Sequence, residues 1–379
     1  QGIEKQKIMD EQNVVNGIIK AKKQAEDALG YHIERVLAAI PSVNVQRHNK
    51  KVSVVPEASS KRIRLSDIQK GLNEAVSFKP DPQLELVNIG CVKYITNGNT
   101  SRKMPIDETA EVLIMNVDLL YADKEVVYAY ARCIEKAGLE ILDVCLDSYA
   151  MANEAAVFEQ TVDKYVIQID LARDHTTLSL FTHGKLVNCE VIEDGYGVWL
   201  QDLMEQYHLS GNVSYRLAQN TCTFDADSAK DQIIYIWSKS GEQKQISEKQ
   251  ACEAIVPHVK DWLNMINETC APIIESGDVR YLLSGEGCEI PSLQELLRYL
   301  NAPAQIYVPQ TIGVRDCSYV TCLGLFYSWR EQMAIRRDER VCCNPQEVEE
   351  TMDTVTKKSS VDEEGGFTRK LKSILLSDK

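Results

Sequence analysis

The sequence has little positive charge and no long apolar run, and each shortage excludes a class of protein. Its 42 lysines and arginines are outnumbered by 56 aspartates and glutamates, which gives a net charge of −14. Nonspecific nucleic-acid binding is therefore excluded, because the chain lacks the cationic surface that releases counterions from phosphates. No apolar stretch reaches the roughly 18 residues that a membrane-spanning helix needs.

The cysteines lack the spacing of a disulfide framework or of a metal site. Twelve are present, scattered among apolar positions such as Cys133, Cys145 and Cys189, and the sequence opens without a signal peptide. We therefore expect buried, reduced thiols in the cytoplasm. Cys317 and Cys322 have no histidine or second cysteine pair nearby, so no metal site is predicted.

The chain is organised around residues 165–197, where apolar residues alternate with polar ones. This pattern predicts three strands, at Val166–Leu171, Thr177–Phe181 and Leu186–Ile192. Asp170 lies at the end of the first strand, and a polar turn follows it. The turn is interpreted either as part of an ordinary β-hairpin or as a hairpin that faces a phosphate group, and the residues alone leave both open.

A second candidate ligand site follows a strand predicted at Arg280–Leu283. Ser284-Gly285-Glu286-Gly287 comes next, and a helix begins soon after it. Glycines let a backbone approach a ligand closely, and a helix N-terminus offers free N–H groups. A tight strand-to-helix turn explains the same pattern, so this interpretation also stays open.

Two longer segments show how the chain is divided. Residues 42–121 are predicted to form strand, helix, strand and strand, a module that interrupts an alternation of strands and helices. A long helix is predicted over residues 247–275, broken or kinked near Pro257, because proline removes a helical hydrogen bond.

The C-terminal end changes composition twice. The segment from Cys342 to Gly366 holds seven acidic residues against two lysines and little to bury, which predicts a disordered linker. On a helix over the next 13 residues, four apolar side chains would share one face: Phe367, Leu371, Ile374 and Leu375. The basic side chains would lie at the sides and on the opposite face: Arg369, Lys370 and Lys372. This pattern predicts a helix that lies in a membrane interface, and docking on the protein's own globular part is the alternative.

The order of these parts resembles that of the FtsA family, actin-like proteins of bacterial cell division. The stretches that carry the resemblance are Gly2-Ile3-Glu4-Lys5, Ala39-Ile40-Pro41, Met104-Pro105-Ile106, Ala137-Gly138-Leu139, Leu283-Ser284-Gly285-Glu286-Gly287, and the linker with its basic tail. The first residue is Gln1 rather than methionine, and the family's first strand pair and first phosphate loop would precede Gly2. We therefore expect that the natural protein starts earlier.

The resemblance implies an α/β, bilobed actin/Hsp70-like fold with an inserted strand-helix-strand-strand subdomain and a C-terminal amphipathic helix. It divides the chain into 1–41 (remnant of subdomain 1A), 42–121 (inserted subdomain 1C, SHS2-type), 122–164 (rest of 1A), 165–197 (first part of 2A), 198–262 (2B), 263–315 (second part of 2A), 316–341 (closing helix of 1A), 342–366 (disordered acidic linker) and 367–379 (membrane-targeting helix).

For nucleotide, the resemblance implies ATP with Mg²⁺ at Asp170, Ala172, Thr176, Thr177, Gly195, Gly285 and Gly287. The chain departs from the family pattern at these loops. Ala172, Arg173 and Asp174 replace glycines, Thr177 replaces a second aspartate, and Glu286 replaces another glycine. A carboxylate repels phosphate, and a threonine holds Mg²⁺-bound water less well than a carboxylate does. We therefore expect weak ATP binding at best, none by a chain that begins at Gln1, and no enzymatic activity.

The function implied by the resemblance is that of a polymerising adaptor rather than a catalyst. The adaptor would polymerise head to tail, bind the tubulin-like FtsZ through residues 198–262, and recruit later divisome proteins. Phe367, Arg369, Lys370, Leu371, Lys372, Ile374 and Leu375 would bind anionic lipids at the cytoplasmic face of the bacterial membrane, at the division septum. Two alternatives stay open: an actin-like scaffold of a pilus-assembly system, and an ATP-hydrolysing kinase or chaperone of the same superfamily.

Overall fold

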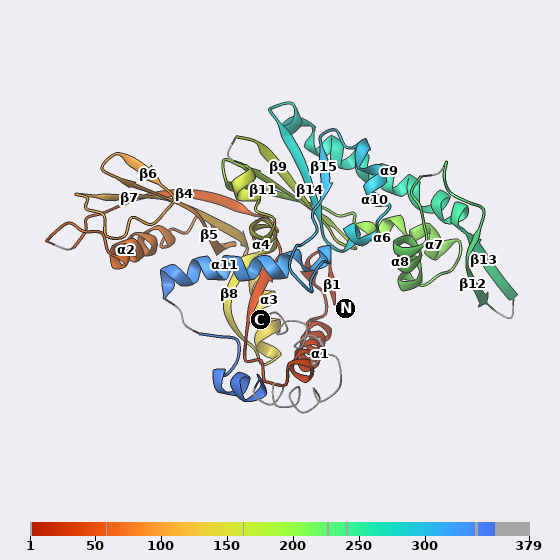
Figure 1. The fold of residues 1–379 in the computed structure, drawn as a ribbon, viewed down its shortest axis with the longest axis horizontal. Coiled ribbons are helices and arrows are strands. Elements are labelled where there is room, and N and C mark those ends of the chain that lie inside the picture. The colour runs from red at the N-terminus through yellow and green to blue at the C-terminus, as the bar shows by residue number, and fades with distance from the viewer. Residues whose placement is uncertain are drawn as a thin grey trace, which may run out of the picture.

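The protein is described by a computed structural model that covers residues 2–57, 59–161, 163–225, 227–239, 242–337 and 340–352. We call residues 2–161 and 316–352 lobe I, and residues 163–315 lobe II. Lobe I lies at the left and bottom of Figure 1, and lobe II at the top and right. Helix α11 (Val320–Arg336) returns from lobe II and runs along lobe I.

Besides a short strand pair near the N-terminus, lobe I contains two larger sheets in its described residues. A parallel pair consists of β3 (Arg35–Ile40) and β8 (Glu140–Leu146), and the second sheet has the order β4-β7-β5-β6. The elements of the second sheet and of its covering helix are β4 (Gln46–Val54), α2 (Leu65–Val76), β5 (Leu84–Thr96), β6 (Asn99–Ser101) and β7 (Leu113–Asp123). The predicted strand-helix-strand-strand insert therefore folds as expected, with one additional short strand. We call it the 1C insert.

The first helix of lobe I is bounded by two residues that its sequence supplies. Asp10 accepts the Asn13 N–H at 3.0 Å and starts α1 (Glu11–Leu29), and Gly30 ends this helix in the left-handed conformation. The remaining elements are β1 (Ile3–Glu4), β2 (Lys7–Ile8), α3 (Lys124–Lys136), α4 (Asp147–Glu154), α5 (Val157–Gln160) and the short 3-10 helix η3 (Cys317–Tyr319).

Lobe II is built on a five-stranded mixed sheet of order β11-β10-β9-β14-β15. Its strands are β9 (Tyr165–Leu171), β10 (Thr176–Thr182), β11 (Lys185–Ile192), β14 (Val279–Ser284) and β15 (Ala304–Ile306). Strands β9 and β14 are parallel, and Asp170 is paired with Ser284. Because the carboxyl ends of parallel strands meet at one edge, the two turns suspected of binding a ligand lie side by side.

The rest of lobe II extends to the right in Figure 1. It comprises α6 (Tyr196–Trp199), α7 (Gln201–Glu205), α8 (Gly211–Asn220), β12 (Ile233–Lys239), β13 (Glu242–Ser247), α9 (Glu248–Ile274), η1 (Glu286–Glu289), α10 (Leu293–Leu296) and η2 (Leu297–Tyr299). Of the predicted break or kink near Pro257, the break is wrong: α9 continues through this residue as one helix. Val256, Val259 and Trp262 are buried in the lobe II core, and this packing holds the helix together on both sides of the proline.

The two lobes share a hydrophobic core at their base. Val166, Phe181 and Leu186 of lobe II are buried in one cluster with Leu146 and Tyr149 of lobe I. The lobes are therefore joined by apolar packing as well as by the chain, and the predicted bilobed α/β architecture is present.

The segment after α11 differs from the prediction of a linker that begins at Cys342. The Cys342 carbonyl oxygen accepts the N–H groups of Glu34 and Arg35, and Cys343 is buried. Residues 345–352 are helical, and the Thr351 hydroxyl donates to the Gly30 carbonyl oxygen. The composition of residues 342–366 could not predict these contacts, because the residues they contact lie far away along the chain. The rest of the predicted linker and the predicted helix 367–379 lie outside the described residues.

The crossing of α11 over α4 yields a test of the packing. A Cβ atom at Gly324 would overlap the carbonyl oxygen of Ala150, which belongs to the backbone of a buried helix. We expect Gly324→Ala to lower the free energy of unfolding by about 3 kcal/mol. Gly17→Ala, in α1, is the matched control because nothing lies within 4 Å of the added methyl group. It should stabilise the protein by about 0.5–1 kcal/mol, because alanine favours helix more than glycine does.

Urea denaturation of both variants measures the difference. Equal stability of the two variants would show that α11 does not approach α4 as closely as the structure places it.

Candidate functional site: the cleft between the lobes

A cleft of about 1270 Å³ opens between lobe I and lobe II. Lobe I contributes the turn between β1 and β2, the end of β3 and the start of α4. Lobe II contributes the β9–β10 turn, residues after β11, helices α6 and α7, and Glu286 of η1. The cleft therefore collects turns that follow strands of both lobes, the arrangement in which α/β proteins place ligands.

Asp170, the next-to-last residue of β9, lines the cleft. Gly285 follows the neighbouring strand with φ +97°, a conformation that favours glycine, and a Cβ atom there would meet the Asp170 carboxylate. Burial, reinforced by the nearby charge of Asp147, raises the pKa of Asp170 to about 7. The carboxyl group is therefore partly protonated near neutral pH.

Asp147 is a cleft residue that the sequence analysis missed. Its carboxylate accepts the Ser42 hydroxyl at 2.5 Å and the Ser148 N–H at 2.6 Å, and burial raises its pKa. The sequence did contain a signal for Asp147, because it directly follows strand β8. Asp170 lies in the same kind of position, next to the end of β9. Two strand ends, one in each lobe, thus bring two aspartates to one cavity.

The two predicted hydroxyl residues are buried behind the cleft rather than lining it. The Thr176 hydroxyl donates to the Asp194 carbonyl oxygen at 2.6 Å and accepts the Trp262 indole N–H at 2.9 Å. The Thr177 hydroxyl accepts the side-chain amide of Gln6 at 3.0 Å. Both threonines are no more than 1% exposed. Their hydrogen-bonding groups are therefore already used by the protein.

Of the other residues predicted to bind nucleotide, one lines the cleft and two lie where backbone segments pack closely. Ala172 lines the cleft. Gly195 lies against the backbone of Ala172 and Arg173, and Gly287 lies against Leu171. These two glycines therefore allow close packing of η1 and of the residues after β11 against the β9–β10 turn.

The charge of the cleft is predominantly negative. Its acidic lining residues are Glu4, Asp147, Asp170, Asp174, Glu193, Asp194, Glu205 and Glu286, against the basic residues Lys5, Arg173 and His175. Lys5 and His175 are themselves paired with carboxylates, at 2.6 Å and 2.7 Å. A polyphosphate would therefore meet an unfavourable potential here.

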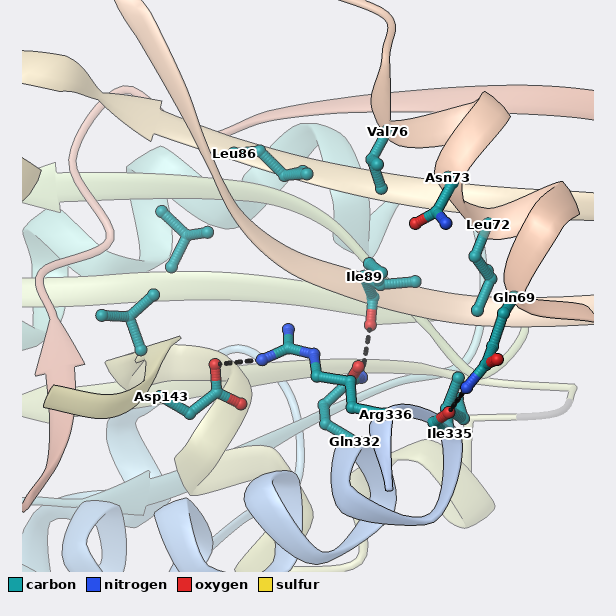
Figure 2. Close-up of a pocket in the computed structure, with 12 residues that line it drawn as sticks. Gln69, Leu72, Asn73, Val76, Leu86, Ile89, Asp143, Gln332, Ile335 and Arg336 are labelled. Atoms are coloured by element: carbon teal, nitrogen blue, oxygen red, sulfur yellow. Dashed lines mark hydrogen bonds and ion pairs between the residues drawn. The ribbon is translucent and has the colours of Figure 1, made fainter. Parts of the chain in front are cut away.

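A second cavity, of about 480 Å³, separates the 1C insert from α11 (Figure 2). The Arg336 guanidinium donates to Asp143 at 2.9 Å, and the Gln69 amide donates to the Ile335 carbonyl oxygen at 2.7 Å. Leu72, Val76, Leu86 and Ile89 supply apolar walls on the side of the insert. The Gln69 contact joins the insert to α11, whereas the Arg336 contact joins α11 to β8.

Within residues 2–352, excluding the gaps, no cluster of three or more histidine, cysteine or acidic side chains has the geometry of a metal site. Over the same ranges, no helix is both long and apolar enough to cross a bilayer. The seven predicted membrane-binding residues, from Phe367 to Leu375, lie outside this part of the chain.

Comparison with solved structures defines the class of protein. The chain superposes on a chain of the PilM–PilN type IV pilus biogenesis complex with a TM-score of 0.54 and 14% identity. The alignment covers 87% of this chain and 88% of that one. No protein-family model matches the sequence. The fold is that of the actin-like ATPases, the class that the bilobed arrangement and the cleft also indicate.

Comparison with curated sequences is more specific. The chain is 26% identical to the cell division protein FtsA of Bacillus subtilis over 332 residues, which are 86% of this chain and 74% of that protein. It is 20% identical to FtsA of Borreliella burgdorferi over 354 residues, which are 90% of this chain and 85% of that protein. The chain is thus a relative of FtsA, and this similarity supports an actin-like role in cell division.

Proposed function

We propose that this protein is a non-catalytic cell-division adaptor that polymerises and tethers FtsZ filaments to the cytoplasmic face of the membrane at the septum, where it recruits later divisome proteins. The observation that carries the proposal is the similarity to FtsA over 86% of the chain. The basic amphipathic segment 367–379 would be the membrane anchor and residues 198–262 the FtsZ-binding region.

The proposal assigns no hydrolysis to the cleft. Asp170 and Asp147 could hold a hydrated cation and thus Mg²⁺ with ATP, but the surrounding carboxylates oppose a polyphosphate. The Thr177 hydroxyl accepts the Gln6 side-chain amide and is buried behind the cleft, so it does not reach a water molecule in the cavity. Nucleotide would therefore bind weakly, and assembly would not depend on its turnover.

An actin-like scaffold of pilus assembly is the second candidate, and the likeness to a chain of the PilM–PilN complex favours it. At 14% identity that likeness shows the fold alone, whereas the sequence relatives are cell-division proteins. The two candidates differ in their partner: an FtsZ filament for the adaptor, and a membrane protein of the pilus system for the scaffold.

Vesicle flotation tests the adaptor function. Polymerised FtsZ is mixed with phosphatidylglycerol-containing vesicles, with and without the full-length protein. We expect FtsZ to float with the vesicles only when the protein is present, because FtsZ would have no membrane contact of its own in this mixture. If the protein floats and FtsZ stays behind, tethering is ruled out and the pilus scaffold becomes the better candidate.

A further inference from the structure

The turn between β1 and β2 reaches from lobe I into lobe II across the cleft. Ile3 pairs with Ile8 and Glu4 with Lys7, so Lys5 and Gln6 form a two-residue hairpin turn. Both have positive φ, 44° and 65°, which is typical of a type I′ turn. Both positions of a type I′ turn need positive φ, which is why Asn-Gly is the preferred pair. Lysine and glutamine do not favour this conformation, so their backbone is strained here.

Strain of this kind persists only where surrounding contacts impose it. The Lys5 backbone N–H donates to the Asp174 carboxylate at 2.6 Å, and the Gln6 side-chain amide donates to the Thr177 hydroxyl at 3.0 Å. The acceptors lie 169 and 171 residues away along the chain, in lobe II. Tyr130, from α3 of lobe I, donates its hydroxyl to the Gln6 carbonyl oxygen at 3.1 Å and fixes the turn from behind.

The burial of these contacts indicates which of them matters. Gln6 is only 4% exposed and Thr177 only 1%, so breaking their hydrogen bond would leave buried polar groups unsatisfied. The ion pair between the Lys5 ammonium and Glu193 is solvent-exposed, with side chains 50% and 74% accessible, and contributes little. The turn is therefore held by Gln6 and by the Lys5 backbone rather than by the lysine charge.

Asp174 is a partly exposed anion, with 41% of its side chain accessible, at the position where the β9–β10 turn of lobe II meets lobe I. Besides the Lys5 N–H, it contacts the His175 imidazole nitrogen Nδ1 at 2.7 Å. Burial opposes its charge, but the hydrogen bonds from Lys5 and His175 outweigh this and lower its pKa. A carboxylate of lobe II thus accepts a backbone N–H of lobe I.

The opposite end of the β10–β11 hairpin is also bonded to lobe I. Arg102 of the 1C insert donates to the His183 carbonyl oxygen at 2.9 Å, and Lys185 pairs with the buried Asp118 at 2.6 Å. The hairpin is therefore bonded to lobe I at both ends, through the insert at its closed end and through the β1–β2 turn at its open end.

We propose that the β1–β2 turn is a built-in latch, in which Gln6 and the Lys5 backbone bind Thr177 and Asp174 and hold the two lobes together across the cleft. The latch goes beyond the adaptor function and does not depend on it.

Hydrogen–deuterium exchange of the full chain tests the latch with the double variant Lys5→Asn/Gln6→Gly. Asn-Gly suits a type I′ turn, so the hairpin itself is kept or strengthened while the Gln6 side chain is lost and the strain is removed. We expect amides of residues 170–177 to exchange about tenfold faster because the cleft opens more often, whereas amides of β2 stay as protected as in the parent. Small-angle scattering should show a larger radius of gyration.

Two single variants complete the test. Asp174→Asn, which removes the acceptor charge in lobe II, should have the same effect on residues 170–177 as the double variant. Glu4→Gln removes a charge from the same hairpin at an exposed position and should leave the exchange unchanged. If residues 170–177 exchange at the parent rate in both the double variant and Asp174→Asn, the lobes are not held by this turn and the proposal is wrong.

Discussion

Replacing Leu371 by glutamate is expected to weaken binding to anionic vesicles by about 10- to 100-fold. Burying a leucine side chain is worth about 1.5–3 kcal/mol, and each 1.4 kcal/mol is a factor of ten in affinity. At 100° per residue, Phe367, Ile374 and Leu375 lie on the same helical face as Leu371. A carboxylate in the middle of this face would also repel anionic lipid headgroups.

Ser373→Glu is the matched control, because a helix over residues 367–379 would place Ser373 opposite the apolar face. It adds an identical charge without removing apolar area, and should weaken binding only by the loss of about one charge contact, roughly 1 kcal/mol. A single helix is short and binds weakly, so multivalent assembly should strengthen the binding of the parent. Binding is measured by sedimentation with vesicles.

The contrast between the two glutamate variants decides between the two interpretations of the segment. If Leu371→Glu and removal of residues 366–379 both leave sedimentation as in the parent, the segment is not the anchor. The alternative of a helix docked on the globular part would then account for its apolar face.

Removing the 1C insert, residues 42–121, is expected to abolish head-to-tail assembly while the rest of the chain still folds. The insert has its own sheet and its own hydrophobic cluster, built on residues such as Ile63, Ile68 and Met115. It therefore carries much of its own stability. The deletion also takes Val45, Val87 and Leu120 out of the shared core at the base of the lobes, so the remaining chain should fold with reduced stability. Electron microscopy on lipid monolayers should show filaments for the parent and none for the deletion.

The deletion also removes contacts between the insert and the rest of the protein, so a variant that keeps the insert folded is needed. Val55 and Val112 flank the paired residues Val54 and Leu113 at the distal end of the insert, where they are 66% and 38% exposed. Substituting both by aspartate should reduce assembly without altering the fold, since exposed apolar neighbours are typical of contact surfaces. Thermal unfolding checks the fold of both variants.

Normal filaments from the deletion would contradict the role of the insert in assembly. In that case the insert would serve only to cover the edge of lobe I, through the contacts it makes around the cavity in Figure 2.

Much of the architecture was predictable because its signals are local. The start and end of α1 follow from Asp10 and Gly30, and the strands of the 1C insert follow from alternating apolar residues. The position of Asp170 at the end of a strand required only the pattern of that strand. The basic amphipathic pattern at 367–379 and the acidic composition before it are likewise properties of adjacent residues.

Only the tertiary structure decided what the cleft contains. Gln6 reaches Thr177 across 171 residues, and Asp147 approaches Asp170 because strands of different lobes end at one place. Pro257 did not break its helix, since burial against lobe II outweighs one missing hydrogen bond. Sequence patterns report which face of an element is buried. Which distant side chain meets it there depends on how the elements pack, so the cleft's hydrogen bonds and charges could not be predicted from local sequence.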